Sequence, residues 1–522
     1  MRAMWSRVVS VLGAALLLAG CGQSPTMTTS TPVVAAMSCA DLPARIVDAV
    51  QEYVDSFGAT DPGAVAGAVT ARQGEFAATT AELRSLGEDL GCDPDDLADG
   101  IREELGRLVG GSPVQDAIAD TFRAGPLGTA DPSDLGAIQV AVGTTDELVA
   151  ALAVAGSGSV IRLGAGEYRL TQPLVMLRAV TLVGAGQDDT VVVAAAEGAL
   201  VIATDGDAVV RDLAISGGAA AVQVAAGGYV LERLRIEEVA GYAIVLRPAA
   251  NPLLPAGARR ELTDVAISGA TAGGVVVAGS EVPSLSGISV DGSDGCGLCF
   301  VEQAAGTATG VSVADAQVGV RVDDDAAPTV RDVTVTGSDV GVAFTGNGAP
   351  GVEDSLVPGG ATGIQVTGDG VGTVARTRLA DVGEVGVRVS GSARVSLVDL
   401  SLEGTRAVGI AVVGAATPIL TGGRVGTTGE VGVIWAETAG GTATGVTVGG
   451  SRLALQVSDD ASPTISGVTV ESAAAGALLA NGRSAGEVSG LTCPEGDGAV
   501  VALAEQTTVV VTGTGCQIVD DR

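Results

Sequence analysis

Short bursts of aliphatic residues alternate with single polar residues through most of the chain, and from Gly274 onward the arrangement returns every 22 or 23 residues. In one repeat, Val320–Val322 encloses Arg321 and Val333–Val335 encloses Thr334. Alternation with a period of two residues sends the valines to one face of a β-strand and the polar residue to the other. Because every burst is short and Asp or Gly residues stand between the bursts, we expect three strands in each repeat, joined by turns.

A repeat of this length that continues over many units predicts a solenoid. Eleven regular repeats begin at Gly274 and about five looser ones precede them, which predicts a mainly β rod of about sixteen coils over residues 143–520. Each strand would pair in parallel with the equivalent strand of the next coil, about 4.8 Å away along the axis. Thr144 and Glu147 have the spacing of a capping box, so we expect a short helix to cover the first coil.

Residues 38–130 have a helical period instead. Leu42–Val54 carries an aliphatic side chain at every fourth position. Three further helix starts are predicted where a capping side chain precedes a proline, at Asp61-Pro62, Asp93-Pro94 and Ser112-Pro113. We interpret this segment as a small domain of four helices, whose role is that of a spacer or of a partner-binding module.

The N-terminus has the organisation of an export signal. Two arginines, Arg2 and Arg7, precede an apolar run that is too short to span a bilayer stably. The run ends in Leu18–Cys21, which resembles the lipobox of bacterial lipoproteins, where the cysteine thiol is acylated. The resemblance implies a signal peptide at 1–20, a lipid on Cys21 and anchoring to the cell membrane on its extracytoplasmic side. Residues 21–37 would be a flexible tether; an ordinary signal peptide with an incidental cysteine is the alternative.

Six cysteines remain beside Cys21, an even number that suits an oxidising compartment. They fall into three pairs: Cys39 with Cys92, Cys296 with Cys299, and Cys493 with Cys516. The last two cysteines share one register and are 23 residues apart, which is one coil. Parallel pairing would hold their Cα atoms about 4.8 Å apart, within the range of roughly 4.4–6.8 Å that a disulfide tolerates, and would place the bridge in the core. A bridge between Cys296 and Cys299 requires a bend at Gly297, because residues i and i+3 of a straight strand face opposite ways.

The stretch from Gly158 to Ala194, "GSVIRLGAGEYRL … VTLVGAGQDDTVVVA", resembles the first coils of pectin-lyase-like, right-handed parallel β-helix proteins. Glu167-Tyr168 stands where that family has a turn after its first strand, and the resemblance extends with the repeats to about Ile518. It implies the right-handed β-helix fold. It does not select an activity, because the fold hosts lyases, hydrolases, esterases, phage tailspikes and binding proteins.

The family's catalytic motifs are not recognisable in this chain. Its galacturonases use a Gly-His-Gly segment, and the chain has no His. Its pectate lyases use a basic residue and Ca²⁺, and the 28 basic residues here are all Arg. The formal net charge of −33 disfavours nucleic acid and polyanions as partners. Aromatic residues make up 2%, and Trp435 falls at an inward position, so a glycan site would be polar rather than built on stacked rings.

Two sets of residues are candidates for ligand binding. The first is the insertion between Arg247 and Arg260, which would gather Arg247, Arg259 and Arg260. The second is an acidic corner that includes Asp324 and continues as a column of Asp325, Asn347 and Asp369 in consecutive coils. Oxygen atoms stacked in this way are candidate ligands for Ca²⁺, the one cofactor the sequence suggests, although Asp and Asn are also common turn residues.

A further outward column alternates Asp, Arg and Gly, and we expect it to form tight turns and stacked ion pairs rather than a catalytic Arg–Asp pair. Its members are Asp212, Arg233, Asp264, Asp332, Asp354, Arg376, Asp399, Gly445 and Gly467.

Three functions fit these observations. The leading hypothesis is a cell-envelope lipoprotein whose rod binds a glycan or an envelope protein without catalysis. The alternatives are a polysaccharide lyase or glycoside hydrolase, and a structural spacer.

Overall fold

The computed structural model describes residues 37–55, 85–111, 137–247, 257–494 and 500–522, with shorter helical pieces between residues 76 and 123. The predicted signal peptide, Cys21, the tether, and the helix starts at Asp61 and Ser112 lie outside the described residues. None of the helices in the described part of the chain is long and apolar enough to cross a membrane.

The N-terminal segment is helical, as its period predicts. Helix α1 spans Leu42–Asp55 and helix α3 spans Pro94–Leu105. The carboxylate of Asp93 accepts hydrogen bonds from the backbone N–H groups of Asp95 and Asp96, at 2.9 and 3.2 Å, so the expected cap before Pro94 is present. Cys39 and Cys92 form a disulfide with a Cα–Cα distance of 5.5 Å, and it links the starts of the two helices.

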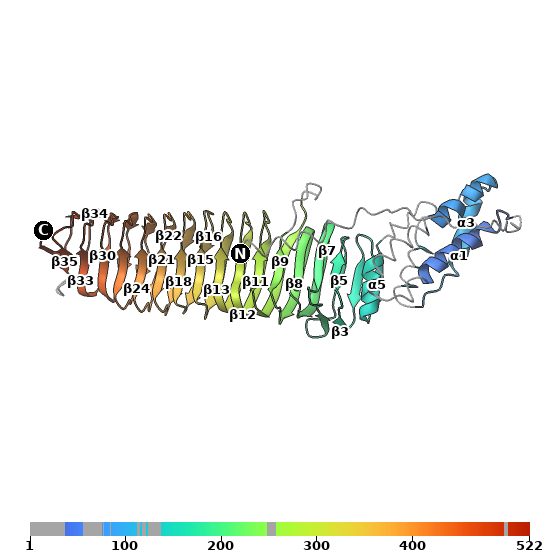
Figure 1. Cartoon of the computed structure of the whole chain (residues 1–522), viewed down its shortest axis with the longest axis horizontal. Coiled ribbons are helices and arrows are strands. Elements are labelled where there is room, and N and C mark those ends of the chain that lie inside the picture. The colour runs from blue at the N-terminus through green and yellow to red at the C-terminus, as the bar shows by residue number, and fades with distance from the viewer. Residues whose placement is uncertain are drawn as a thin grey trace, which may run out of the picture.

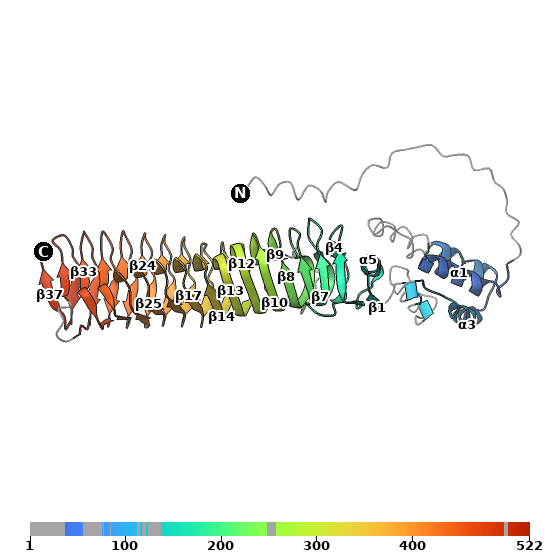
Figure 2. The same ribbon diagram turned by 90° about the horizontal axis from the view of Figure 1, so that it is seen from below.

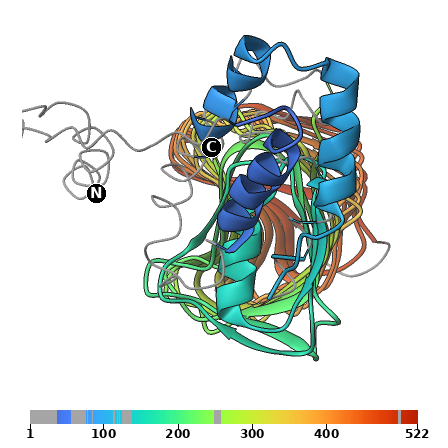
Figure 3. The same ribbon diagram turned by 90° about the vertical axis from the view of Figure 1, so that its right-hand side faces the viewer.

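The rest of the described chain is a parallel β-helix of about sixteen coils, as the repeat predicts. Figures 1 and 2 show the coils stacked along one axis, and Figure 3 shows that they superpose when viewed along it. All pairings between named strands are parallel, and the strands form three sheets that wrap around one aliphatic core. The rod begins at strand β1 (Gln139–Val142), upstream of the expected Gly143.

Six long strands turn the corners of the coil and so contribute to more than one sheet. They are β7 (Leu200–Ser216), β8 (Val222–Glu237), β10 (Arg260–Ala270), β12 (Ser284–Phe300), β13 (Thr307–Val322) and β14 (Thr329–Thr336).

The shorter strands each belong to one sheet. The first sheet adds β4 (Leu174–Met176), β9 (Tyr242–Leu246), β11 (Gly273–Val277), β15 (Val340–Phe344), β18 (Thr362–Val366), β21 (Val385–Val389), β24 (Val408–Val412), β27 (Val431–Trp435), β30 (Ser451–Val457), β33 (Ala473–Ala480), β35 (Val500–Leu503) and β37 (Gln517–Asp520). The second sheet adds β1, β2 (Val160–Leu163), β5 (Thr181–Val183), β16 (Gly351–Glu353), β19 (Thr373–Ala375), β22 (Ser396–Val398), β25 (Ile419–Thr421), β28 (Thr442–Thr444), β31 (Thr464–Ser466), β34 (Glu487–Ser489) and β36 (Val510–Thr512). The third sheet adds β3 (Gly166–Arg169), β6 (Thr190–Val193), β17 (Leu356–Pro358), β20 (Arg378–Ala380), β23 (Ser401–Glu403), β26 (Arg424–Val425), β29 (Thr447–Val448) and β32 (Thr469–Val470).

In the regular coils from β11 to β27, each strand of the first sheet has a glycine at the position that opens the repeat. At Gly341, a Cβ atom would overlap the side chain of Val357 and the carbonyl oxygen of Gly363 in the next coil. Glycine is therefore required by the close approach of the coils rather than by its backbone angles. The strand bends here: the glycine and the residue after it both face the core and the residues that flank them face outward, so positions three apart in this strand share one face.

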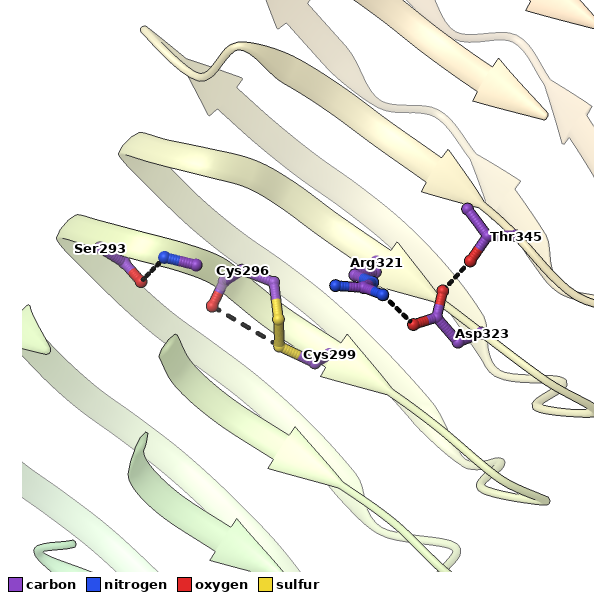
Figure 4. Close-up of a disulfide and its surroundings, with 7 residues drawn as sticks. Ser293, Cys296, Cys299, Arg321, Asp323 and Thr345 are labelled. Carbon is purple, nitrogen blue, oxygen red and sulfur yellow. Dashed lines mark hydrogen bonds and ion pairs between the residues drawn. A yellow bond between two sulfur atoms is a disulfide. The ribbon is translucent and has the colours of Figure 1, made fainter. Parts of the chain in front are cut away.

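The disulfide between Cys296 and Cys299 depends on the same bend, here at Gly297 (Figure 4). Both cysteines are buried, and their Cα atoms are 5.9 Å apart. They lie on the outer side of the first sheet in a small apolar cluster with Val276, separate from the main core. The corner that the sequence required is thus present.

Both ends of the rod differ from its middle. Helix α5 (Thr145–Val154) covers the first coils through Leu148, Ala151 and Val154, and Thr144 caps it through the N–H of Glu147 at 3.2 Å. At the other end, Cys493 and Cys516 form the expected disulfide, with Cα atoms 5.3 Å apart. Both cysteines are half-buried and pack against the core, so the bridge lies at the edge of the core rather than fully inside it as expected.

Candidate functional site

A polar groove runs along the surface of the early coils where the second and third sheets meet. Its volume is about 560 Å³, and it is lined by Gln187, Asp188, Asp212, Arg233, Asp264, Val265, Ala266, Gly287 and Ser289. Gln187 and Asp188 follow β5, whereas the remaining residues come from β7, β8, β10 and β12. The solenoid therefore brings together residues that are up to about a hundred positions apart in the chain.

The floor of the groove is a column of left-handed backbone corners. Asp212, Arg233 and Asp264 have φ angles of 60°, 49° and 54°, and Gly287 continues the column at 62°. The same corner returns in each later coil and ends at Gly513 with φ 58°. Asp and Gly are common there because they tolerate a positive φ, so the tight turn expected for this column is confirmed.

Ion pairs connect successive members of the column. The guanidinium of Arg233 donates to both carboxylate oxygens of Asp212, at 2.5 and 3.0 Å. This hydrogen bonding lowers the pKa of Asp212 and raises that of Arg233. Arg376 and Asp354 repeat the arrangement farther along the rod, at 2.7 and 3.0 Å. The stacked ion pairs that the sequence predicted are present in both places.

Arg235 closes one side of the groove. Its guanidinium donates to the carbonyl oxygen of Gln187 at 2.9 Å, lies 3.7 Å from Asp188, and also donates to Glu237 at 3.2 Å. These contacts fix the segment after β5 against β8. Three aspartates and one arginine thus line the groove within a few coils, and Arg235 borders it.

Glu281 forms a buried polar cluster that sequence reasoning missed. The hydroxyl of Tyr229 donates to Glu281 at 2.7 Å, and the guanidinium of Arg260 lies 3.5 Å from its other carboxylate oxygen. Tyr229 and Glu281 are 0% and 2% exposed. Burial raises the pKa of Glu281 despite both partners, and it also raises the pKa of Tyr229 well above its usual range.

The repeat contained the signal for this cluster. Glu281 stands seven positions after Gly274, and the same position in later coils is a fully buried alanine, as at Ala304, Ala326 and Ala393. A glutamate in an otherwise alanine column could have been recognised as a buried acid.

Each arginine of the insertion pairs with a different acid. Arg247 lies 2.5 Å from Glu302, Arg259 lies 2.5 Å from Glu261, and Arg260 contacts Glu281. Residues 248–256 between them lie outside the described residues. The ligand site at Arg247, Arg259 and Arg260 stays a prediction. In the structure, the guanidinium group of each of these arginines already has a glutamate partner.

The acidic corner lies on the exposed turn after the first sheet. Asp324, Asp325, Asn347 and Asp369 are all exposed. Asp324 has a φ of 56° and accepts a hydrogen bond from the N–H of Glu302 at 3.1 Å, while Ser392 donates to Asp369. Across the described residues, no group of three or more Asp, Glu or Cys side chains is placed to hold a metal ion. Calcium binding at Asp325, Asn347 and Asp369 stays a prediction.

Trp435 lies in the core with 0% exposure, as its inward register predicts. It therefore offers no platform for a sugar ring. The chemistry available on this part of the rod is that of carboxylates, guanidinium groups and a serine hydroxyl lining an open groove.

No protein-family profile and no curated protein matches the chain. Among solved structures, it is similar to the catalytic unit of a thermostable GH87 α-1,3-glucanase from Streptomyces thermodiastaticus, with 15% identity over 76% of this chain and 70% of that chain, and a TM-score of 0.33. It is also similar to a PL6 alginate lyase in complex with a trisaccharide, with 8% identity over 73% and 86% of the two chains and a TM-score of 0.40. A third similar chain is the pre-mature bacteriophage phi29 gene product 12, with 10% identity over 69% and 64% of the two chains and a TM-score of 0.37. The similarity concerns the fold and assigns no residue of this chain a role.

Proposed function

We propose that the groove binds a neutral polysaccharide. The observation that supports this proposal is the composition of the groove, which Asp188, Asp212, Asp264 and Arg233 line and Arg235 borders. Carboxylates accept hydrogen bonds from sugar hydroxyls, and guanidinium groups donate to them. The groove is open and polar, and it follows the rod axis, which suits an extended chain of hydroxyl-bearing units.

The charge balance selects a neutral ligand over an anionic one. Three carboxylates, those of Asp188, Asp212 and Asp264, line the groove with the single guanidinium group of Arg233, and the whole chain carries a formal charge of −33. An acidic polysaccharide would be repelled by the surrounding surface unless a cation bridged the two. A neutral polysaccharide meets no such repulsion.

Hydrolysis of the bound polysaccharide is the second candidate function, and one observation favours it. Asp212 and Asp264 occupy the same column two coils apart, which separates their backbones by about 9.6 Å. Carboxyl pairs of inverting glycosidases are roughly 6.5–9.5 Å apart, a range whose upper end is close to this backbone separation. In such a reaction Asp212, whose pKa is lowered by its hydrogen bonds to Arg233, would be the ionised carboxylate that activates water.

The cellular location of the protein is part of the proposal. A lipid on Cys21 would hold the chain at the extracytoplasmic side of a membrane, with the rod exposed to envelope glycans. An envelope protein in place of a glycan, or a purely structural rod, would leave every polysaccharide unbound in the following experiment.

The experiment measures binding of the full chain to a panel of neutral and acidic polysaccharides, with and without Ca²⁺. Arg233→Asn is the test variant and Arg376→Asn is the matched control, because both arginines occupy the same left-handed corner, pair with an Asp, and can be replaced by Asn, which tolerates a positive φ. We expect a neutral polysaccharide to bind, Arg233→Asn to weaken it about tenfold or more, and Arg376→Asn to bind as the wild type does. New reducing ends would indicate hydrolysis and unsaturated products a lyase. Absence of binding to every polysaccharide, or equal loss in both variants, would contradict the proposal.

A further inference from the structure

The outer side of the first sheet is apolar along most of the rod. Two outward columns make up this surface, which we call the apolar face. The first column consists of Gly273, Cys296, Val318, Val340, Thr362, Val385, Val408, Val431, Leu453 and Gly476. The second consists of Val276, Cys299, Arg321, Ala343, Gln365, Arg388, Ala411, Ile434, Gln456 and Leu479. None of these residues is acidic in a chain of formal charge −33.

The other two sheets differ from the apolar face. The outward positions of β28 are Thr442 and Thr444, and those of β31 are Thr464 and Ser466. The third sheet presents Arg378 and Glu403 in an ion pair at 2.8 Å. Aliphatic side chains are half-buried on the apolar face at Val385, Val408, Val431 and Leu453. A continuous, partly exposed apolar stripe on a rod surface is a candidate interaction site.

We infer that the apolar face binds the apolar face of a second copy of this chain, with the two rods side by side and parallel. Area supports a second copy as the occupant. Ten coils at about 4.8 Å and four residues at about 3.3 Å give a face of about 600 Å². Two such faces bury about 1,200 Å², which is the lower end of the range for specific protein interfaces. A second rod has the same repeat and covers the whole length.

Charge supports the parallel arrangement. Arg388 lies on the apolar face, and among the described residues it makes no ion pair. Glu384 stands on the opposite edge of the same strand and is exposed. A two-fold axis parallel to the rods reverses the strand direction across the interface, so that Arg388 of one chain faces Glu384 of the other. An antiparallel arrangement would oppose like edges of the strands instead.

Dimerisation through this face leaves the groove free. The groove lies at the corner between the second and third sheets, whereas the apolar face is formed by the first sheet. The inference rests on the outer surface of the first sheet alone, so it holds or fails independently of glycan binding.

Sedimentation equilibrium of the full chain carrying Cys21→Ser tests the inference, because that substitution prevents acylation and leaves no free thiol. We expect twice the mass of one chain. Glu384→Arg should shift the mass toward one chain, and the exchange variant Glu384→Arg with Arg388→Glu should restore the dimer. Glu403→Arg on the third sheet is the control and should leave the mass unchanged. A monomeric wild-type chain, or failure of the exchange to restore the dimer, would overturn the inference.

Thiol cross-linking tests the orientation. Val385 is near the middle of the apolar face, so Val385→Cys meets its counterpart in either orientation of two rods. Leu453 is near one end, so Leu453→Cys meets its counterpart only between parallel rods. We expect a short bis-maleimide to cross-link both variants and to leave Thr442→Cys, on the second sheet, uncross-linked. Cross-linking at Val385→Cys alone would overturn the parallel arrangement.

Discussion

The hydroxyl of Tyr229 donates a hydrogen bond to the carboxylate of Glu281 across a separation of 52 residues, at 2.7 Å and inside the rod. Two coils of the solenoid are thereby joined by side chains as well as by backbone. The contact lies where the repeat elsewhere places alanine, so it replaces apolar packing by a hydrogen bond and an ion pair with Arg260.

Glu281→Ala should lower the free energy of unfolding by about 1–3 kcal/mol, because it leaves the buried hydroxyl of Tyr229 without a partner. The double variant Tyr229→Phe with Glu281→Ala removes both polar groups and should cost less than the sum of the single changes. Urea unfolding of the four proteins measures this coupling. Additive effects would contradict a direct Tyr229–Glu281 interaction.

The stability of the fold should depend on pH through Glu281. Burial raises the pKa of this carboxyl above its ordinary value of 4.5, so the folded state holds the proton more tightly than the unfolded state. Its contribution is fully present below about pH 4.5 and is lost as pH rises through the folded pKa. Glu281→Gln removes the titration, so the melting temperature of this variant relative to the wild type should rise with pH over that window. A difference that is constant with pH would contradict the shift.

Gly341→Ala should destabilise the rod by about 1–3 kcal/mol, because the added methyl group overlaps Val357 and the carbonyl oxygen of Gly363. Gly351→Ala is the matched control in the same coil. A Cβ atom at Gly351 has no neighbour within 4 Å, so that change should be neutral or slightly stabilising. Thermal melting of the two variants makes the comparison, and equal losses would show that backbone freedom rather than coil spacing selects glycine here.

Removal of the Cys493–Cys516 disulfide should loosen the last coil first. In the chain-entropy model a loop of this length contributes about 3 kcal/mol. Replacement of both cysteines by Ser should therefore raise amide hydrogen exchange in β35 and β36 while β15 stays protected. Uniform loss of protection along the rod would instead show that the solenoid unfolds as one unit.

Cys21→Ser should release the protein from membranes or leave it unprocessed, because the thiol that would carry the lipid is absent. Fractionation of cells and the mass of the mature N-terminus provide the measurement. Normal membrane association of the variant would show that the lipobox resemblance does not describe this protein.

The sequence by itself determined the β-helix, its coil number and the register of its regular coils. A strict period and two-residue alternation leave few folds open, since every valine must face a common core. The register then placed Cys493 beside Cys516, required the bend at Gly297, and buried Trp435. It was less accurate near the ends: the pairing of Leu453 with Gly476 shows that the inward position of that coil is Ala477 rather than the expected Gly476.

Only the tertiary structure assembled the groove and the Glu281 cluster. Gln187 and Asp188 precede the regular repeats. They reach the groove because Arg235 holds their segment against β8, and the repeat pattern of the sequence does not predict this contact. The arginines of the insertion looked like one basic site in sequence, yet each found a different carboxylate among neighbouring coils. The inward or outward orientation of a residue in the repeat follows from the local sequence pattern and from backbone pairing. The ion-pair partners of long charged side chains depend instead on distance and burial, which are set only when the coils are stacked.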